Sequence, residues 1–313
     1  MNYKQLNDEK KAKIDVLLEL NYSMRQIGRI MEISHSTVSR YKNNVYKKRN
    51  IDIKSKYKDF IEYLDKHYDS KCNSIEVCIY KFKKFHPSKP CVSFQTVYNW
   101  INDGKINIGV QDTCYKRSKR KKKKTNGMMN HLKWNFENKT VLPISLRPKY
   151  VEKRDELGHL EIDSIIGKKN EYPAIISIVD RCSRKIWLIK AKARNDYYTM
   201  NLIHKYIVEN EIEVKSITVD NGLEFKVMGI AAKRLGVKLY KCDPYCSFQR
   251  GTNERSNALV RRFIPKSKSL YQVEQQYLDD IMFKINEMPR KMFDFKTPHE
   301  VEFNKMISGA VEI

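Results

Sequence analysis

Three acidic residues in the C-terminal half have the types and positions that metal-dependent phosphoryl transfer requires. Asp163 lies inside a predicted strand, Asp220 follows a later strand, and Glu254 lies one turn into a predicted helix. Carboxylates that are brought together repel one another unless cations neutralise them, and their hard oxygens suit Mg²⁺ or Mn²⁺. Two such ions about 3.5–4 Å apart activate an attacking oxygen and stabilise the leaving one at phosphorus. The sequence therefore predicts that Asp163, Asp220 and Glu254 are catalytic residues and hold two metal ions.

Each acid taken alone has a plainer explanation. A single Asp163 is compatible with a buried, hydrogen-bonded carboxylate of a strand. Asp220 begins an Asp-Asn-Gly sequence, which is a common turn. Glu254 alone is an ordinary acid on a helix surface. The prediction therefore depends on the combination of the three acids and on the elements that position them.

The apolar pattern of residues 147–313 predicts a mixed sheet. Three close, strand-length runs separated by turn residues indicate an antiparallel meander. Helices and shorter strands then alternate, which is the element order of an RNase H-like α/β domain. The predicted elements are strands 159–166, 174–179 and 186–191, helix 196–210, strand 216–219, helix 228–235, strand 237–240 and a helix from Gln249.

Net charge indicates a polyanionic partner. The 313 residues contain 61 Lys and Arg against 37 Asp and Glu, a net charge of +24, and most of the excess lies in the first 150 residues. Eight of the nine residues 116–124 are basic. Like charges at this density resist compact folding, so we predict a basic linker over 113–146 in which Lys121 and Lys122 contact DNA phosphates. A merely solvated tether is the alternative.

Two helical units precede this linker. Residues 1–50 show a short helix, a tight turn and a third helix rich in hydroxyl and basic side chains, the layout of a DNA-reading helix-turn-helix. Residues 51–112 repeat the layout more weakly. A three-helix bundle without DNA function shares the pattern. The residues expected to face DNA are Ser36, Thr37, Ser39 and Arg40 in the first unit, and Ser93, Gln95 and Thr96 in the second.

Several sequence strings around the three acids resemble a known family. They are residues 158–167 around Asp163, 218–225 around Asp220, 243–254 ending at Glu254, and the closing segments 261–266 and 289–301. Together these strings resemble the DDE transposases of bacterial insertion sequences, of the insertion-sequence 30 type, which have a retroviral-integrase-like core. The sequence departs from the family pattern at Leu160 and Phe248, where the family usually has Trp.

The resemblance implies a DNA transposase that binds terminal inverted repeats and carries out DNA strand cleavage and strand transfer. It implies that the three acids hold the metal ions, and that Asn257 and Arg261, on the same helix face as Glu254, contact DNA. It further implies double-stranded DNA as partner and a homo-oligomer, at least a dimer on DNA. A non-catalytic DNA-binding regulator and a structure-selective nuclease of the same fold are the rival functions.

The cellular compartment follows from cysteine usage and hydropathy. Seven scattered cysteines, an odd number, argue against a disulfide framework and favour a reducing compartment. No stretch of about 18 consecutive apolar residues exists, so no membrane partner is expected. The predicted location is the bacterial cytoplasm, in association with the nucleoid.

Overall fold

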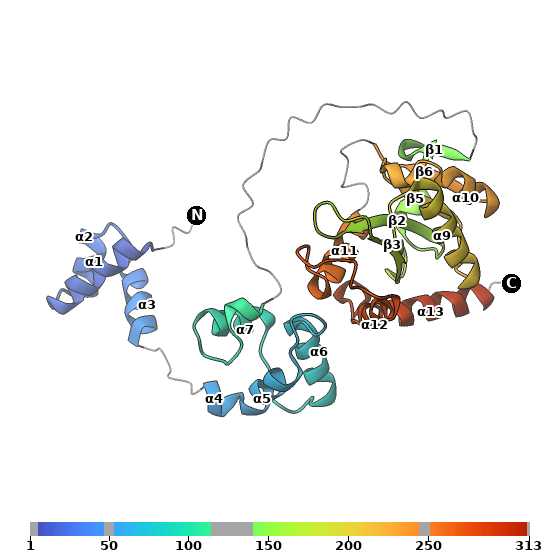
Figure 1. Ribbon diagram of the computed structural model, residues 1–313. Coiled ribbons are helices and arrows are strands. Elements are labelled where there is room, and N and C mark those ends of the chain that lie inside the picture. Colours follow the sequence, from blue (N-terminus) through green and yellow to red (C-terminus); the bar gives the residue numbers. More distant parts are fainter. Residues whose placement is uncertain (1–5, 47–52, 114–139, 244–250, 312–313) are drawn as a thin grey trace. The chain divides into compact units, whose positions relative to one another are not determined.

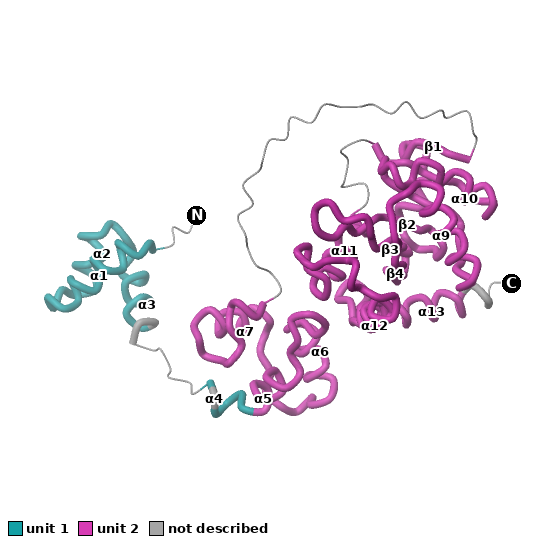
Figure 2. The backbone as a smooth tube through the Cα atoms, viewed as in Figure 1, with its two compact units in different colours: residues 1–58 teal, residues 59–313 magenta. Residues whose placement is uncertain are grey.

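The computed structural model describes residues 6–46, 53–113, 140–243 and 251–311. They form two compact units, residues 1–58 and residues 59–313 (Figure 2). Each unit is considered by itself below. No helix in the described ranges combines the length and the apolar character that crossing a membrane requires.

The first unit is a bundle of three helices, α1 (Asp8–Glu19), α2 (Met24–Ile30) and α3 (His35–Tyr46). Side-chain caps begin α1 and α2: Asn7 accepts a hydrogen bond from Lys10 N, and Ser23 forms a capping box with Gln26. One fully buried residue from each helix makes the centre of the core. These residues are Ile14, Ile27 and Val38. The predicted helix-turn-helix layout is therefore present, with Val38 pointing inward.

Gly28 permits the close approach of α2 to the turn before α3. A Cβ atom at this position would lie 2.9 Å from the backbone oxygen of Ile33 and 3.2 Å from the backbone nitrogen of His35. The backbone nitrogen of Ile33 in turn donates to Gly28 O at 2.9 Å. Because real Cβ atoms do not approach a backbone oxygen so closely, the tightness of the turn depends on glycine here.

The second unit begins with helices and continues into a sheet. Its helices are α5 (Lys58–His67), α6 (Ile75–Phe85) and α7 (Phe94–Asn102), followed by a 3-10 turn, η1 (Val110–Asp112), whereas the short α4 (Ile53–Lys56) belongs to the first unit. Ser74 and Ser93 cap α6 and α7 as their sequence positions predict. The single helix expected from Ile53 to Tyr68 is instead interrupted at Tyr57.

The described residues of the second unit include a six-stranded sheet with the order β1-β6-β5-β2-β3-β4. Strands β2, β3 and β4 form an antiparallel meander, whereas β2, β5, β6 and β1 pair in parallel. The strands are β1 (Val141–Pro143), β2 (His159–Ile166), β3 (Ala174–Asp180), β4 (Ile186–Ala191), β5 (Ser216–Val219) and β6 (Lys238–Lys241). This is the predicted mixed sheet, and β1 is an addition to it.

Helices cover both faces of the sheet (Figure 1). Ile162 and Ile217 belong to the core that packs under α9 and α10, whereas Ile165 and Val179 belong to the core under α11 and α12. The remaining helices of this region are α8, before β2, and α13, at the C-terminal end. Their bounds are α8 (Lys149–Lys153), α9 (Asp196–Glu209), α10 (Met228–Arg234), α11 (Gly251–Phe263), α12 (Gln275–Asn286) and α13 (Pro298–Val311).

The fold class is confirmed: helical units with a helix-turn-helix layout precede an RNase H-like mixed α/β sheet. One predicted boundary is wrong. The basic linker was expected to continue to residue 146, but Val141–Pro143 pair with β6 as the edge strand β1. The domain limits 1–50, 51–112 and 147–313 remain predictions, and residues 114–139 of the predicted linker lie outside the described residues.

The contact at Gly28 gives a first prediction. Alanine normally stabilises a helix interior by about 1 kcal/mol relative to glycine. We expect Gly28→Ala to destabilise the first unit instead, by about 1–3 kcal/mol, because the methyl group is forced against Ile33 O. Peptide-resolved amide hydrogen exchange of the full chain should show faster exchange in α2 and α3. Arg29→Ala, at an exposed neighbouring position, is the control, and slower exchange in Gly28→Ala would contradict the prediction.

Candidate active site

Asp163 lies inside β2, and Asp220 directly follows β5, the parallel neighbour of β2. The register of β2 and β5 pairs Leu160 with Ile217 and Glu161 with Thr218. Asp163 and Asp220 are each two residues further along the chain than the last of these pairs. Because residues two apart share a face of a strand, Asp163 shares the α11-covered face of β2 with Glu161 and Ile165. Both aspartates are partly buried.

Hydrogen bonds hold Asp163 against helix α11. Its Oδ1 accepts from the backbone nitrogen of Ser164 at 2.9 Å, and its Oδ2 accepts from Asn257 Nδ2 at 2.9 Å. Ser177 of β3 donates to Asn257 Oδ1 at 2.8 Å. Asn257 thus links the helix to two strands and fixes the orientation of the Asp163 carboxylate.

Asp220 is ordered by the turn that follows β5. Gly222 N donates to Asp220 Oδ1 at 2.8 Å, and Asn221 Nδ2 donates to Cys242 O at 2.7 Å. A Cβ atom at Gly222 would lie 2.9 Å from Asp220 Oδ1 and 2.9 Å from Glu224 Oε2. Glycine therefore leaves room beside two carboxylates, and Glu224 is in turn bound by the Ser164 hydroxyl at 2.5 Å.

Glu254 is in the first turn of α11 and has an exposed side chain. It lies one turn before Asn257, on the helix face that meets Asp163. Within the described residues, however, no three Asp, Glu, His or Cys side chains are grouped closely enough to hold a metal ion. The structure thus places Asp163 in β2, Asp220 after the neighbouring strand β5 and Glu254 on helix α11, and the three-carboxylate metal site remains a prediction.

The donor set of the two aspartates fits a hard divalent cation. Their carboxylate oxygens are the ligands that Mg²⁺ and Mn²⁺ prefer. The missing side chain at Gly222 leaves space beside Asp220 Oδ1 and Glu224 Oε2. Asp163, Asp220 and the exposed Glu254 are therefore suitable to hold such ions.

Lys241 is a cation buried beside Asp220. It ends β6 opposite Val219, the residue before Asp220, and only 4% of it is exposed. Burial lowers the pKa of Lys241 to about 7, and the negative charge of Asp220 opposes part of this shift. Its Nζ also approaches Phe225 O at 3.4 Å. The amine therefore places a titratable charge next to the candidate site.

The residues predicted to contact DNA have different environments. Asn257 is bound to Asp163 and Ser177, and Arg261 donates to Ile166 O at 2.5 Å, with burial lowering its pKa. Both are thus attached to the sheet. Within the helical units, Ser36, Thr37, Ser39 and Thr96 are partly buried, whereas Arg40, Ser93 and Gln95 are exposed. Lys121 and Lys122 lie outside the described residues.

Sequence analysis overlooked Glu161, which the structure places next to the site. It lies on the same face of β2 as Asp163 and is completely buried. Glu161 Oε2 accepts from the backbone nitrogen of Asn253 at 3.2 Å, and Oε1 accepts from Arg181 Nη1. An acid between the apolar residues Leu160 and Ile162 was the available signal, because burying a charge requires a specific partner.

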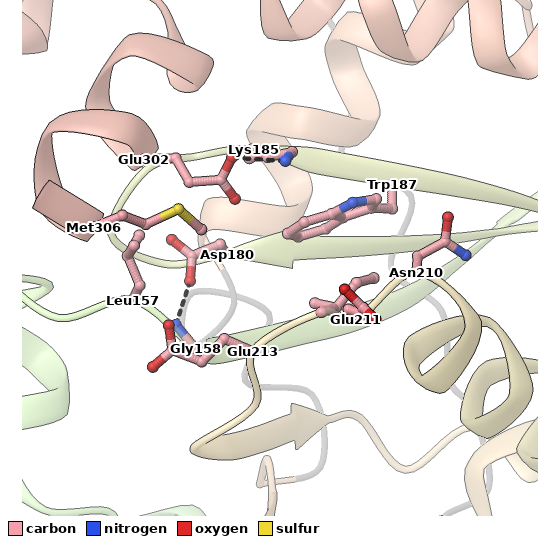
Figure 3. Close-up of a pocket in the computed structure, with 11 residues that line it drawn as sticks. Leu157, Gly158, Asp180, Lys185, Trp187, Asn210, Glu211, Glu213, Glu302 and Met306 are labelled. Atoms are coloured by element: carbon pink, nitrogen blue, oxygen red, sulfur yellow. Dashed lines mark hydrogen bonds and ion pairs between the residues drawn. The ribbon is translucent and has the colours of Figure 1, made fainter. Parts of the chain in front are cut away.

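The two cavities differ in their relation to these acids. One, of about 160 Å³, is lined by residues such as Asp180, Trp187 and Glu302, with Lys185 paired to Glu302 at 2.6 Å (Figure 3). It lies where β2 and β5 begin, away from Asp220, and belongs to a different end of the sheet. The other, more open and about 400 Å³, is bordered by Glu224 and adjoins the turn after Asp220.

The chain is similar to transposases of bacterial insertion sequences. It is 34% identical over 217 residues to a transposase for insertion sequence element IS4351 of Bacteroides fragilis, covering 69% of this chain and 65% of the relative. It is 31% identical over 227 residues to a probable transposase for insertion-like sequence element IS1161 of Streptococcus salivarius, covering 72% and 63%. It is 38% identical over 162 residues to a transposase for insertion sequence element IS30A of Escherichia coli strain K12, covering 51% and 41%.

These matches confirm the resemblance that the sequence strings indicate, and the chain spans less than two thirds of the length of each of these relatives. No protein-family model matches the chain. Among solved structures, a simian T-cell lymphotropic virus intasome matches with a TM-score of 0.39 and 17% identity, covering 46% of this chain and 53% of that chain. The catalytic core domain of BIV integrase matches with a TM-score of 0.38 and 16% identity, covering 49% and 97%.

The buried Lys241 amine predicts how the free energy of unfolding changes with pH. The unfolded chain keeps the Lys241 proton up to its ordinary pKa of 10.5, whereas the folded chain releases it near pH 7. Stability should therefore be lowest below pH 7 and rise as the pH increases toward 10.5. We expect Lys241→Met to stabilise the metal-free protein by a few kcal/mol near neutral pH, and the gain to shrink at higher pH. Urea unfolding from about pH 6 to about pH 9 tests this; a gain that does not depend on pH would contradict it.

Proposed function

We propose that this chain, a relative of the insertion-sequence transposases, is a DDE-type DNA transposase. It would bind the terminal inverted repeats of an insertion element and catalyse metal-dependent DNA strand cleavage and strand transfer. The observation that supports the proposal is the register of β2 and β5, which pairs Glu161 with Thr218, two residues before Asp163 and Asp220, while Asn257 of α11 binds Asp163. The sequence similarity to insertion-sequence transposases supports the same function.

Asp163, Asp220 and Glu254 are the residues that would hold two Mg²⁺ or Mn²⁺ ions. The ions would neutralise the carboxylates, activate an attacking oxygen and stabilise the leaving oxygen at phosphorus. The protein's own residues contribute by orienting these carboxylates. Asn257 orients the Asp163 carboxylate, and the backbone nitrogen of Gly222 orients that of Asp220.

Cleavage and joining are the same type of reaction at phosphorus. In the first step water displaces the 3′-oxygen of one DNA strand, and in the second the freed 3′-hydroxyl attacks a phosphodiester of the target. Each step is an in-line displacement in which one P–O bond forms while another breaks. A single carboxylate site can therefore serve both, without a covalent intermediate on the enzyme.

DNA recognition would belong to the first half of the chain. An exposed Arg40 on α3 and the exposed residues Ser93 and Gln95 of α7 are suited to reading or holding the repeats. The basic segment over 116–124 would add strong, salt-dependent phosphate binding. Because two element ends must be joined in one complex, at least a dimer on DNA is expected, acting on nucleoid DNA in a bacterial cytoplasm.

The effect of Asp220→Asn distinguishes this function from that of a non-catalytic regulator. Asp220→Asn preserves size and the turn while removing a negative charge from the proposed metal site. We expect strand transfer to fall at least a thousandfold, equivalent to about 4 kcal/mol in the activation barrier, with repeat binding unchanged. The assay incubates the protein with Mg²⁺, labelled DNA ends carrying the inverted repeats that flank the gene, and a plasmid.

Glu209→Gln, a change at an exposed acid of α9, is the matched control and should retain activity. Wild-type protein that binds the repeats but neither cleaves nor joins them would support the regulator. Cleaved ends without any joined product would instead support a nuclease of the same fold.

A second prediction concerns repeat recognition by α3. We expect Arg40→Ala to weaken binding to the inverted repeats about tenfold, which is within the range for one base-edge contact. If Arg40 contacts a phosphate instead, the slope of log affinity against log salt should decrease by about one and all sequences should be affected equally. Fluorescence anisotropy at several salt concentrations distinguishes the two, with Lys10→Ala, at an exposed position of α1, as the control of equal charge. Unchanged affinity in Arg40→Ala would remove α3 from the interface.

A further inference from the structure

A chain of alternating charges, buried except at Glu152, leads to the strand positions two residues before the aspartates. Glu161 of β2 pairs with Arg181, and Arg181 Nη2 donates to Glu152 Oε2 at 2.8 Å. Glu152 Oε1 accepts from Arg147 Nε at 2.8 Å, and Arg147 Nη1 donates to Thr218 Oγ1 at 3.1 Å. Two acids and two arginines thus balance one another, and the chain of contacts runs from β2 to β5.

The two ends of this charge chain are in register with the proposed metal ligands. Glu161 pairs with Thr218 across β2 and β5, and Asp163 and Asp220 are the next residues on the same faces. Glu161 and Thr218, the ends of the charge chain, therefore lie two residues before Asp163 and Asp220. The charge chain is connected to the proposed site through the backbones of β2 and β5.

Glu161 also caps helix α11. The backbone nitrogen of Asn253, the third residue of the helix, donates to Glu161 Oε2 at 3.2 Å. The first four N–H groups of an α-helix have no partner within the helix, and a carboxylate there is favoured by the helix dipole. Here a fully buried acid of a neighbouring strand supplies the acceptor, so the cap also joins the helix to β2.

Glu254 is bracketed by attachments to the sheet. Asn253, immediately before it, is held by Glu161, and Asn257, three residues after it, is held by Asp163 and Ser177. A third contact runs from Arg184 Nη1 to Thr252 Oγ1 at 2.6 Å. These contacts fix both the axial position and the rotation of the first turn of α11, and with them the position of the Glu254 backbone.

We propose that Glu161 is a positioning residue that sets the first turn of α11, and thereby Glu254, relative to Asp163 and Asp220. The effect on metal binding rests on the proposed function, whereas the effect on the helix does not. Arg181 donates to one oxygen of the Glu161 carboxylate and orients it, and the backbone nitrogen of Asn253 donates to the other. Glu161 itself, being fully buried between strand and helix, is not proposed to bind a metal ion.

The test compares Glu161→Gln with Glu152→Gln. Both remove one carboxylate from the same charge chain and leave Arg181 with one fewer acidic partner, but only Glu161 contacts α11. Mn²⁺ binding to the full chain, followed by electron paramagnetic resonance of the free ion, should weaken at least tenfold in Glu161→Gln and less than about twofold in Glu152→Gln. Amide exchange of the metal-free protein should accelerate in residues 252–256 in Glu161→Gln alone.

The two measurements separate the possible failures. Equal weakening of Mn²⁺ binding in both variants, or unchanged exchange at residues 252–256 in Glu161→Gln, would overturn the proposal. A wild-type protein that binds no Mn²⁺ would refute the proposed metal-dependent function, and the exchange comparison would still decide whether Glu161 fixes the helix. If Glu161→Gln fails to fold, Glu161→Asp retains the charge but shortens the reach toward Asn253, and the same weakening and acceleration are expected.

Discussion

The burial of carboxylates between β2 and α11 is the constraint on which this part of the structure depends. Taking a charge out of water costs several kcal/mol unless partners replace the lost hydration. Glu161 is fully buried and is compensated by Arg181 and the N-terminus of a helix. Asp163, one step further on the same face, is partly buried and bound by Asn257. The strand therefore satisfies its inner acid within the protein and leaves the outer one beside Asp220, where a cation is expected.

Charge is separated along the chain as the proposed chemistry requires. Most of the net charge of +24 lies in the first 150 residues, whereas the three proposed catalytic acids lie in the second half. Basic side chains bind the DNA backbone without regard to sequence, and too many of them beside the carboxylates would compete with metal ions. Lys241 is a buried amine next to Asp220, and burial lowers its pKa to about 7. The charge of this amine therefore changes near neutral pH.

Local sequence signals predicted the secondary-structure elements better than they predicted which elements or side chains pair with each other. Apolar runs gave β2, β3 and β4, and the hydroxyl caps gave the starts of α2, α6 and α7, because these signals depend only on neighbouring residues. Strand β1 was missed, since three residues become a strand only through pairing with β6. The acids Asp163 and Asp220 were chosen from sequence, but the parallel pairing of the two distant strands that lead to them, β2 and β5, is set by the fold. Glu161 was overlooked because its partners, Arg181 and the backbone of Asn253, are brought to it only by the fold.

The third acid differs from the other two in how its place is determined. Main-chain hydrogen bonds fix the register of β2 and β5 up to Glu161 and Thr218, two residues before Asp163 and Asp220, and the turn after β5 then orders Asp220. A helix packed on a sheet has no such ladder and can slide or rotate. Apolar contacts of Leu259 and Val260 select which face of α11 meets the sheet, but they are not directional. Directional contacts near Glu254 must supply the remaining precision, and this explains why a buried carboxylate, costly in itself, stands at the first turn of that helix.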